Sequence, residues 1–248
     1  MAINRHEQRF YRSRLQSDDM VTFRVVVKET DLYIHAVKDL EKTAKELVLQ
    51  YRGYIESYIA KYPQFGSTLQ PLGIIGTAPL IILDMAQAGV SAGVGPMAAV
   101  AGAIAEHVGK DLLTHSADVI VENGGDVFLK TTKRVTMGIY AGSSPLSLRV
   151  GLKVGGRKDP VSVCTSSGTV GHSFSMGCAD AVCVISNNGA LADAVATATG
   201  NRVSSKSDIQ EAIEYSSKIN GVDGLVVILD EQIGLWGNVE MVQLPIDR

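Results

Sequence analysis

The sequence predicts an α+β fold in which helices and strands are partly segregated along the chain. Helical patterns dominate before residue 117, whereas short β-branched segments bounded by Gly, Pro or Ser dominate after it. Neither a repeat nor a linker interrupts the 248 residues, so we expect one domain over 1–248, with a division into two subdomains near residue 117 as the alternative. The sheet should be mixed or antiparallel, with Gly/Ala-rich helices packed closely on it.

The first elements are a strand pair and a long helix. Residues 21–37 alternate apolar and polar positions on either side of a polar turn, which predicts a β-hairpin. From Asp39 to Tyr62 the apolar residues recur at steps of three and four, which predicts an amphipathic helix that Pro63 ends.

Two further helices are apolar on nearly every side. Thr77 predicts the start of the first and Gly89 its end, while Pro96 opens a second helix that runs to about Thr114. The uncharged stretch 88–105 has the length of a membrane span but consists mainly of Ala and Gly. Burying such small side chains releases little transfer free energy, so we expect central helices of a soluble protein.

The remainder of the chain predicts strands, then two helices, then strands again. Five short strand patterns occupy 119–130, 135–142, 146–156, 161–168 and 179–186. Helical patterns occupy 189–200 and 207–219, and strands return at 224–230 and around Trp236.

Composition excludes several classes of partner and compartment. The net charge is −3, so no basic excess points to nucleic acid or an anionic membrane. Three cysteines are too few for a paired framework and indicate a reducing compartment. The N-terminal stretch has no apolar run typical of a secretory signal, so we expect a cytoplasmic protein. Its arginines form either a solvated arm or a phosphate-binding cluster: Arg5, Arg9, Arg12 and Arg14.

The first candidate binding motif is Asn-Gly-Gly-Asp at 123–126, after an apolar strand. Adjacent glycines allow a ligand to approach backbone N–H groups, as phosphate-binding turns require. The same residues also predict a simple hairpin turn. The two interpretations are compatible.

The second is the hydroxyl- and glycine-rich run from Thr165 to Gly177, which includes His172. Such a loop can hold an anion, with His172 as a base or ligand. A nucleophilic Ser166 activated by His172 is an alternative, with Asp180 or Asp193 orienting the imidazole, although the strained elbow of hydrolases is missing from the sequence. A polar loop without a ligand is the third interpretation.

The third candidate is the pair Asp193 and Thr197, which lie four positions apart on a predicted helix and therefore share a face. Two hard oxygens that project together suit Mg²⁺. Alternatively, Asp193 caps or flanks the start of its own helix, and Thr197 bonds to the carbonyl four residues earlier.

In order along the chain, GAIAEH at 102–107, VENGGDV at 121–127, TSSG at 165–168 and LADAVATA at 191–198 resemble the motifs of the ApbE superfamily, the Mg²⁺-dependent FAD:protein FMN transferases. The N-terminal FYRSRL and VVVKETDLYI, with GPMAAVAGAIAE, are more similar to a smaller uncharacterised ApbE-like family. The resemblance implies an ApbE-like fold.

The resemblance also implies a site. Asp193 and Thr197 match the side chains that hold magnesium, and Ala105 matches the backbone carbonyl that completes that site. The matches to the flavin nucleotide pocket and to the Thr-Ser-Gly turn are Gly124, Gly125, Asp126, Thr165, Ser167 and Gly168. His172 lies near the position of the family histidine.

Two departures bear on activity. Glu106 stands where the transferases carry lysine, and Ser173-Phe174-Ser175 replaces a segment that should continue to Asp-Pro. We therefore expect the protein to bind a phosphorylated small molecule, FAD or another nucleotide, together with Mg²⁺. The protein is then either a flavin or phosphoryl transferase or a pyrophosphate-cleaving enzyme. Alternatively, it is a non-catalytic carrier of a flavin or nucleotide. A structural homo-oligomer assembled through the Gly/Ala helices is the third reading.

Overall fold

The computed structural model describes residues 20–167 and 177–245. Its strands are β1 (Val21–Val27), β2 (Thr30–Ala36), β3 (Val119–Asn123), β4 (Asp126–Lys130), β5 (Arg134–Gly138), β6 (Val150–Gly155), β7 (Val161–Ser166), β8 (Ala181–Ser186), β9 (Val222–Leu229), β10 (Gln232–Gly237) and β11 (Met241–Gln243). Its helices are α1 (Glu41–Lys61), α2 (Gln64–Ser67), α3 (Leu80–Ala92), α4 (Val100–Leu112), α5 (Gly189–Gly200) and α6 (Ile209–Ser217), with 3₁₀ turns η2 (Pro96–Ala99) and η3 (Lys206–Asp208).

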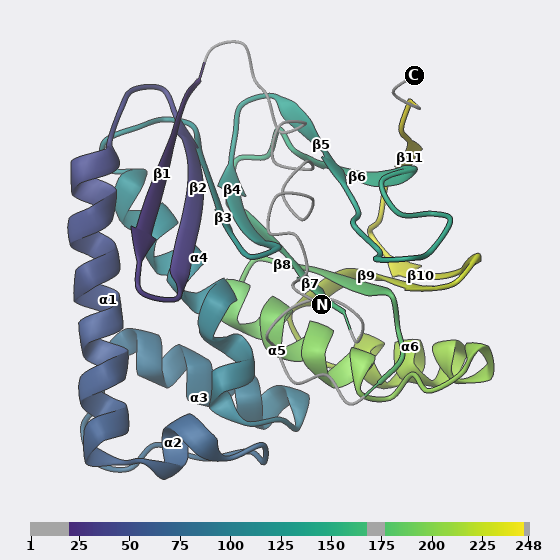
Figure 1. The fold of residues 1–248 in the computed structure, drawn as a ribbon, viewed down its shortest axis with the longest axis horizontal. Coiled ribbons are helices and arrows are strands. Elements are labelled where there is room, and N and C mark those ends of the chain that lie inside the picture. Colours follow the sequence, from purple (N-terminus) through teal and green to yellow (C-terminus); the bar gives the residue numbers. More distant parts are fainter. Residues whose placement is uncertain (1–19, 168–176, 246–248) are drawn as a thin grey trace, which may run out of the picture.

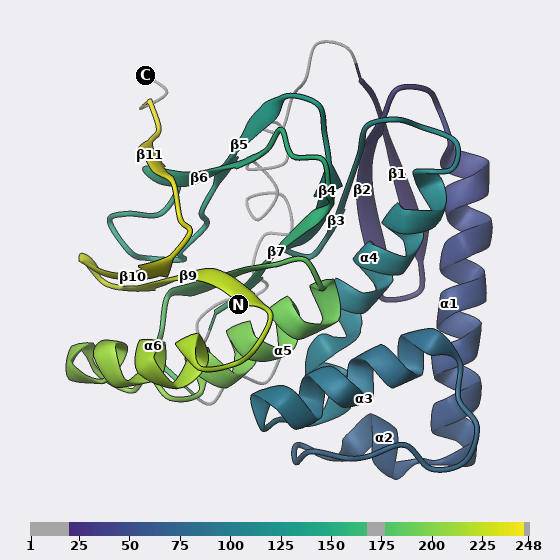
Figure 2. The same ribbon diagram turned by 180° about the vertical axis from the view of Figure 1, so that it is seen from behind.

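The strands form two antiparallel sheets. The larger has eight strands in the order β1-β2-β3-β4-β7-β8-β9-β10, and the smaller has the order β11-β6-β5. Helices cover one face of the large sheet and the small sheet lies on the other (Figure 1 and Figure 2). The expected α+β class with an antiparallel sheet and packed helices is confirmed. Because β2 pairs with β3, strands from both sides of residue 117 share one sheet.

Two apolar cores follow from the alternation of side chains along the strands. In β4, Phe128 points into the core beneath the helices, whereas Val127 and Leu129 point into the core beneath the small sheet. β7 repeats this pattern with Cys164 on the helical side and Val163 on the other. Strands buried on both faces explain the nearly continuous apolar runs of the sequence.

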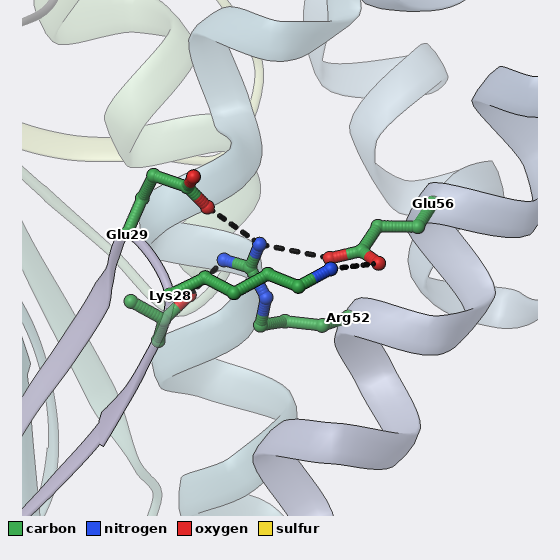
Figure 3. A network of polar contacts seen from close by, with 5 residues as sticks. Lys28, Glu29, Arg52 and Glu56 are labelled. Atoms are coloured by element: carbon green, nitrogen blue, oxygen red, sulfur yellow. Dashed lines mark hydrogen bonds and ion pairs between the residues drawn. The ribbon is translucent and has the colours of Figure 1, made fainter.

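The predicted hairpin and long helix are confirmed, and charged side chains join them (Figure 3). Arg52 of α1 donates to Glu29 at 2.6 Å, to Glu56 at 2.8 Å and to the Thr30 hydroxyl at 2.7 Å. Lys28 donates to the second oxygen of Glu56 at 2.7 Å. These bonds fix the tip of the hairpin against α1.

The predicted end at Gly89 of the helix that corresponds to α3 is wrong. α3 continues to Ala92 and ends at Gly93, which adopts the left-handed conformation with φ of 72°. Gly89 instead provides room for the returning chain, because a Cβ there would lie 2.8 Å from the carbonyl oxygen of Val94. α2 and β11 were not expected from the sequence.

The apolar helices lie inside the protein rather than forming a straight span. No single helix among the described residues is long and apolar enough to cross a membrane. Leu80–Ala92 and Pro96–Leu112 meet the criteria of length and composition only as a pair, and this pair is bent by 108°.

Candidate functional site

The candidate site forms where α5 crosses the beginning of α4. Asp193 lies on α5, and its Oδ2 accepts the N–H groups of Ala101 at 3.1 Å and Gly102 at 2.9 Å. These are among the first N–H groups of α4, which have no partner inside their own helix. Asp193 thus caps α4 from a neighbouring helix and places negative charge at the positive end of the helix dipole.

The interpretation of Asp193 as a cap of its own helix is wrong. Asn188 occupies that position, since its Oδ1 accepts the N–H of Leu191 at 2.7 Å. The threonine of α5 that bonds to the carbonyl four residues earlier is Thr199, whose hydroxyl donates to Val195 at 2.7 Å. Thr197 is 8% exposed and Asp193 is partly exposed.

A buried carboxylate, Asp126, lies near the partly exposed Asp193. It follows the tight turn of Gly124 and Gly125, whose φ values of 67° and 114° favour glycine, so the predicted hairpin is confirmed. Oδ1 of Asp126 accepts the N–H of Thr165 at 3.1 Å. This bond joins the Gly-Gly-Asp turn to the end of β7.

Both carboxylates are costly to ionise in this environment. Burial raises the pKa of Asp126 well above its usual value, and the charge of Asp193 raises it further. Burial also raises the pKa of Asp193 to about 7, although the N–H groups of Gly102 and Ala101 oppose this shift. A bound cation would offset this concentration of negative charge.

Ser166 is the last residue of β7 and follows Thr165, whose N–H donates to Asp126. Its side chain is 7% exposed, and its Oγ has no hydrogen-bond partner among the described residues. A buried hydroxyl without a partner is unfavourable unless a ligand or water satisfies it. Ser167 follows on the same segment, whereas Gly168 and His172 lie outside the described residues.

The roles of two side chains near the site do not follow from the sequence motifs. Asn123 donates from Nδ2 to the carbonyl of Ala101 at 3.0 Å, which ties β3 to the start of α4. Glu106 accepts the N–H of Gly189 at 2.6 Å. The backbone groups that meet Asp193 belong to Ala101 and Gly102, one turn before Ala105, whose assignment as a metal ligand stays a prediction.

Asp180 and two of the three cysteines are buried. Oδ2 of Asp180 accepts the N–H of Asp230 at 2.7 Å and so holds the turn after β9. Cys164 is fully buried, and burial raises the pKa of its thiol well above the usual value. Burial likewise raises the pKa of Cys183 to about 11, while Cys178 is exposed.

The donor set fits a hard cation with few protein ligands. The part of the chain that the structure describes contains no cluster of three His, Cys, Asp or Glu side chains able to hold a metal. Both hydrogen bonds that Asp193 accepts from the described residues reach Oδ2, which leaves Oδ1 without a partner in that part of the chain. One carboxylate with a neighbouring hydroxyl suits Mg²⁺, which keeps several waters and binds substrate phosphates.

Comparisons with solved structures identify the fold. The apo flavinyl transferase ApbE of Pseudomonas stutzeri matches with a TM-score of 0.57 at 13% identity, over 91% of this chain and 95% of that one. The ApbE protein of Thermotoga maritima matches with a TM-score of 0.53 at 12% identity, over 89% and 96%. The chain therefore has the ApbE fold.

Sequence comparisons identify the family. A UPF0280 protein of Methanococcus aeolicus is 40% identical over 226 residues, covering 89% of this chain and 91% of that protein. A UPF0280 protein of Methanocaldococcus jannaschii is 41% identical over 222 residues, covering 87% and 90%. The family model described as AbpE bacteria matches residues 12–234. The chain therefore belongs to this ApbE-like family, together with the UPF0280 proteins.

Proposed function

We propose that the chain binds a flavin nucleotide, or a related phosphorylated ligand, together with Mg²⁺ at Asp193 and Thr197. The observation that carries the proposal is the anchored carboxylate of Asp193, held through Oδ2 by two N–H groups of α4 beside the buried Asp126. Such an arrangement preorganises one oxygen for a cation and makes the cation favourable. When bound, Mg²⁺ would neutralise charge on the phosphate oxygens of the ligand.

The residues around this pair have complementary roles. The Gly124-Gly125 turn offers backbone that a ligand can approach closely, since a Cβ at Gly124 would meet no atom within 4 Å. The Ser166 hydroxyl, which has no partner in the part of the chain that the structure describes, would donate to a phosphate oxygen. Thr165, Ser167 and Gly168 would extend the same binding loop.

Carriage of the ligand is favoured over group transfer by the position of Glu106. By the resemblance above, transferases carry lysine there. In this chain the Glu106 side chain is 2% exposed and bound to Gly189 and Lys110, so it does not reach a ligand. Transfer would also need a base, and general-base assistance contributes about 10²–10⁴-fold. His172 is the candidate for that role.

The small residues of α4 and α5 weigh against a purely structural oligomer. Gly102 and Gly189 make contacts inside the chain, so an interface between copies is not needed to explain them.

Purified protein tests the proposal in two stages. Absorbance and mass spectrometry of any small molecule that co-purifies come first, followed by calorimetry with FAD, FMN and ADP, with and without Mg²⁺. We expect Mg²⁺-dependent affinity in the micromolar range. Failure of all three nucleotides to bind would overturn the proposal.

The second stage separates carriage from transfer. FAD, Mg²⁺ and a Thr- or Ser-containing acceptor peptide are incubated with the protein, and the peptide mass is followed. We expect no appreciable FMN transfer. Multiple turnovers would replace carriage by the full transferase activity.

A further inference from the structure

Helices α4 and α5 cap each other. Asp193 of α5 accepts N–H groups at the start of α4, as described above. In return, Oε2 of Glu106 on α4 accepts the N–H of Gly189, the first residue of α5, at 2.6 Å. Each helix therefore receives a carboxylate from the other at its positive end.

Both oxygens of the buried Glu106 carboxylate have a partner. Its side chain is 2% exposed, and Oε1 lies 2.6 Å from Nζ of Lys110, one turn further along α4. Both carboxylate oxygens thus have a charged or N–H partner, which is the condition under which a buried charge is tolerated. Because the Glu106 carboxylate is buried and each of its oxygens has its own partner, it differs from an exposed surface ion pair.

The hydrogen bond between Glu106 and Gly189 fixes the position of α5 relative to α4, and therefore the position of Asp193. Gly189 and Asp193 are one helical turn apart, about 6 Å along the axis. The contact surface allows little sliding, since a Cβ at Gly189 would lie 3.1 Å from Cβ of Glu106 itself. A shift of α5 away from Glu106 would draw Asp193 away from Ala101 and Gly102.

We infer that Glu106 is a positioning residue for the Asp193 and Thr197 oxygens. It holds α5 in the register in which Asp193 meets the start of α4. The inference rests on the proposed cation and nucleotide site and assigns to Glu106 no contact with the ligand. Loss of Glu106 weakens cation-dependent binding through the displacement of Asp193.

A matched control separates this role from general stability. Asp180 is also a buried carboxylate, 4% exposed, that accepts one backbone N–H, from Asp230 at 2.7 Å. It belongs to the β8–β9 end of the large sheet rather than to the α4–α5 contact. Asp180→Asn therefore reports the cost of disturbing a buried acid elsewhere.

The first measurement needs no ligand. Amide exchange of Ala101 and Gly102 is followed by NMR in wild type, Glu106→Ala, Glu106→Asp, Glu106→Gln and Asp180→Asn, each rate divided by that of Val108 in the same helix. We expect Glu106→Ala to raise the ratio more than tenfold. Glu106→Asp, which is one methylene shorter, should raise it as well.

The remaining two variants complete this measurement. Glu106→Gln keeps an acceptor for Gly189 and should stay near wild type, as should Asp180→Asn. Equal ratios in Glu106→Ala and Asp180→Asn would overturn the inference. If Glu106→Ala does not fold, a wild-type ratio in Glu106→Asp overturns it.

The second measurement is calorimetry of ADP with Mg²⁺ on the same proteins. We expect at least a tenfold loss of affinity in Glu106→Ala, recovery in Glu106→Gln, and wild-type affinity in Asp180→Asn. Wild-type affinity in Glu106→Ala would overturn the inference about Glu106 and would leave the proposed function standing. Absence of binding to the wild type by ADP, FMN and FAD would overturn the proposed function, while the exchange ratios still decide whether Glu106 positions Asp193.

Discussion

Gly102 of α4 and Gly189 of α5 lie back to back, each occupying the space of the other's missing side chain. A Cβ on Gly102 would lie 2.2 Å from the carbonyl oxygen of Gly189, and a Cβ on Gly189 would lie 2.7 Å from that of Gly102. The helices can cross this closely only because both positions are glycine. The contact brings Asp193 within hydrogen-bond distance of the α4 backbone.

Gly102→Ala should therefore lower the free energy of unfolding by about 3 kcal/mol or more, because backbone atoms must separate to admit the methyl group. Chemical denaturation measures the change. Gly53→Ala is the control, since a Cβ there meets no atom within 4 Å and α1 is a regular helix. That control should be neutral or gain up to about 1 kcal/mol. Equal stability of the two variants would contradict the close contact.

Thr197→Val should weaken Mg²⁺-dependent nucleotide binding about tenfold, the usual effect of one lost polar contact to a charged ligand. Thr199→Val is a matched control on the same helix, since the Thr199 hydroxyl bonds to Val195 and Ser216. It should lower the melting temperature while leaving the nucleotide dissociation constant unchanged. Calorimetry that finds both variants equally impaired would argue against a direct role for Thr197.

Ser166→Ala should weaken ligand binding without destabilising the unliganded protein. The Ser166 hydroxyl is buried without a partner among the described residues, so its removal breaks no hydrogen bond within 20–167 or 177–245. Ser162→Ala is the control on the same face of β7, because Ser162 Oγ has no partner there either. Thermal melts and nucleotide titrations of both variants provide the measurement. Loss of affinity in both would point to a general change in β7.

His35 should make the protein less stable in mild acid. It is 2% exposed, and burial lowers the pKa of its imidazole below the ordinary value of 6.5. The unfolded chain therefore binds more protons just below pH 6.5, so stability is present above this pH and declines as the pH falls through the window. The Thr22 hydroxyl lies 2.9 Å from Nδ1 of the imidazole, and the Tyr33 ring packs edge-on against it.

Urea denaturation at pH 7.5 and 5.5 tests this dependence. His35→Gln should lose less stability between the two pH values than wild type does. His115→Gln, which changes an exposed imidazole, should behave as wild type. An unchanged pH dependence in His35→Gln would assign the effect to other groups.

Local patterns were sufficient to predict most of the fold. Alternation in 21–37 predicted the first hairpin, and Pro63 predicted the end of α1 correctly. Gly89 was misread because a glycine inside a helix resembles a stop, whereas its role depends on the returning chain at Val94. Periodicity carries no information about such tertiary contacts.

The site was predictable only in part for the same reason. The spacing of Asp193 and Thr197 was enough to place them on one helix. It could not indicate that Asp193 caps α4, because Ala101 is 92 positions away along the chain. Similarly, the sequence marked Glu106 only as an unusual residue, and its bond to Gly189 emerges from the packing of two helices.

The distance along the chain between α4 and α5 has a kinetic consequence. Consecutive strands such as β1 and β2 pair through a short turn, whereas the contacts of Asp193 with Ala101 and of Glu106 with Gly189 close loops of 92 and 83 positions. Closing such loops costs more chain entropy, so we expect these contacts to form after the folding transition state. A ligand that bridges α4 and α5 should then slow unfolding and leave the folding rate nearly unchanged.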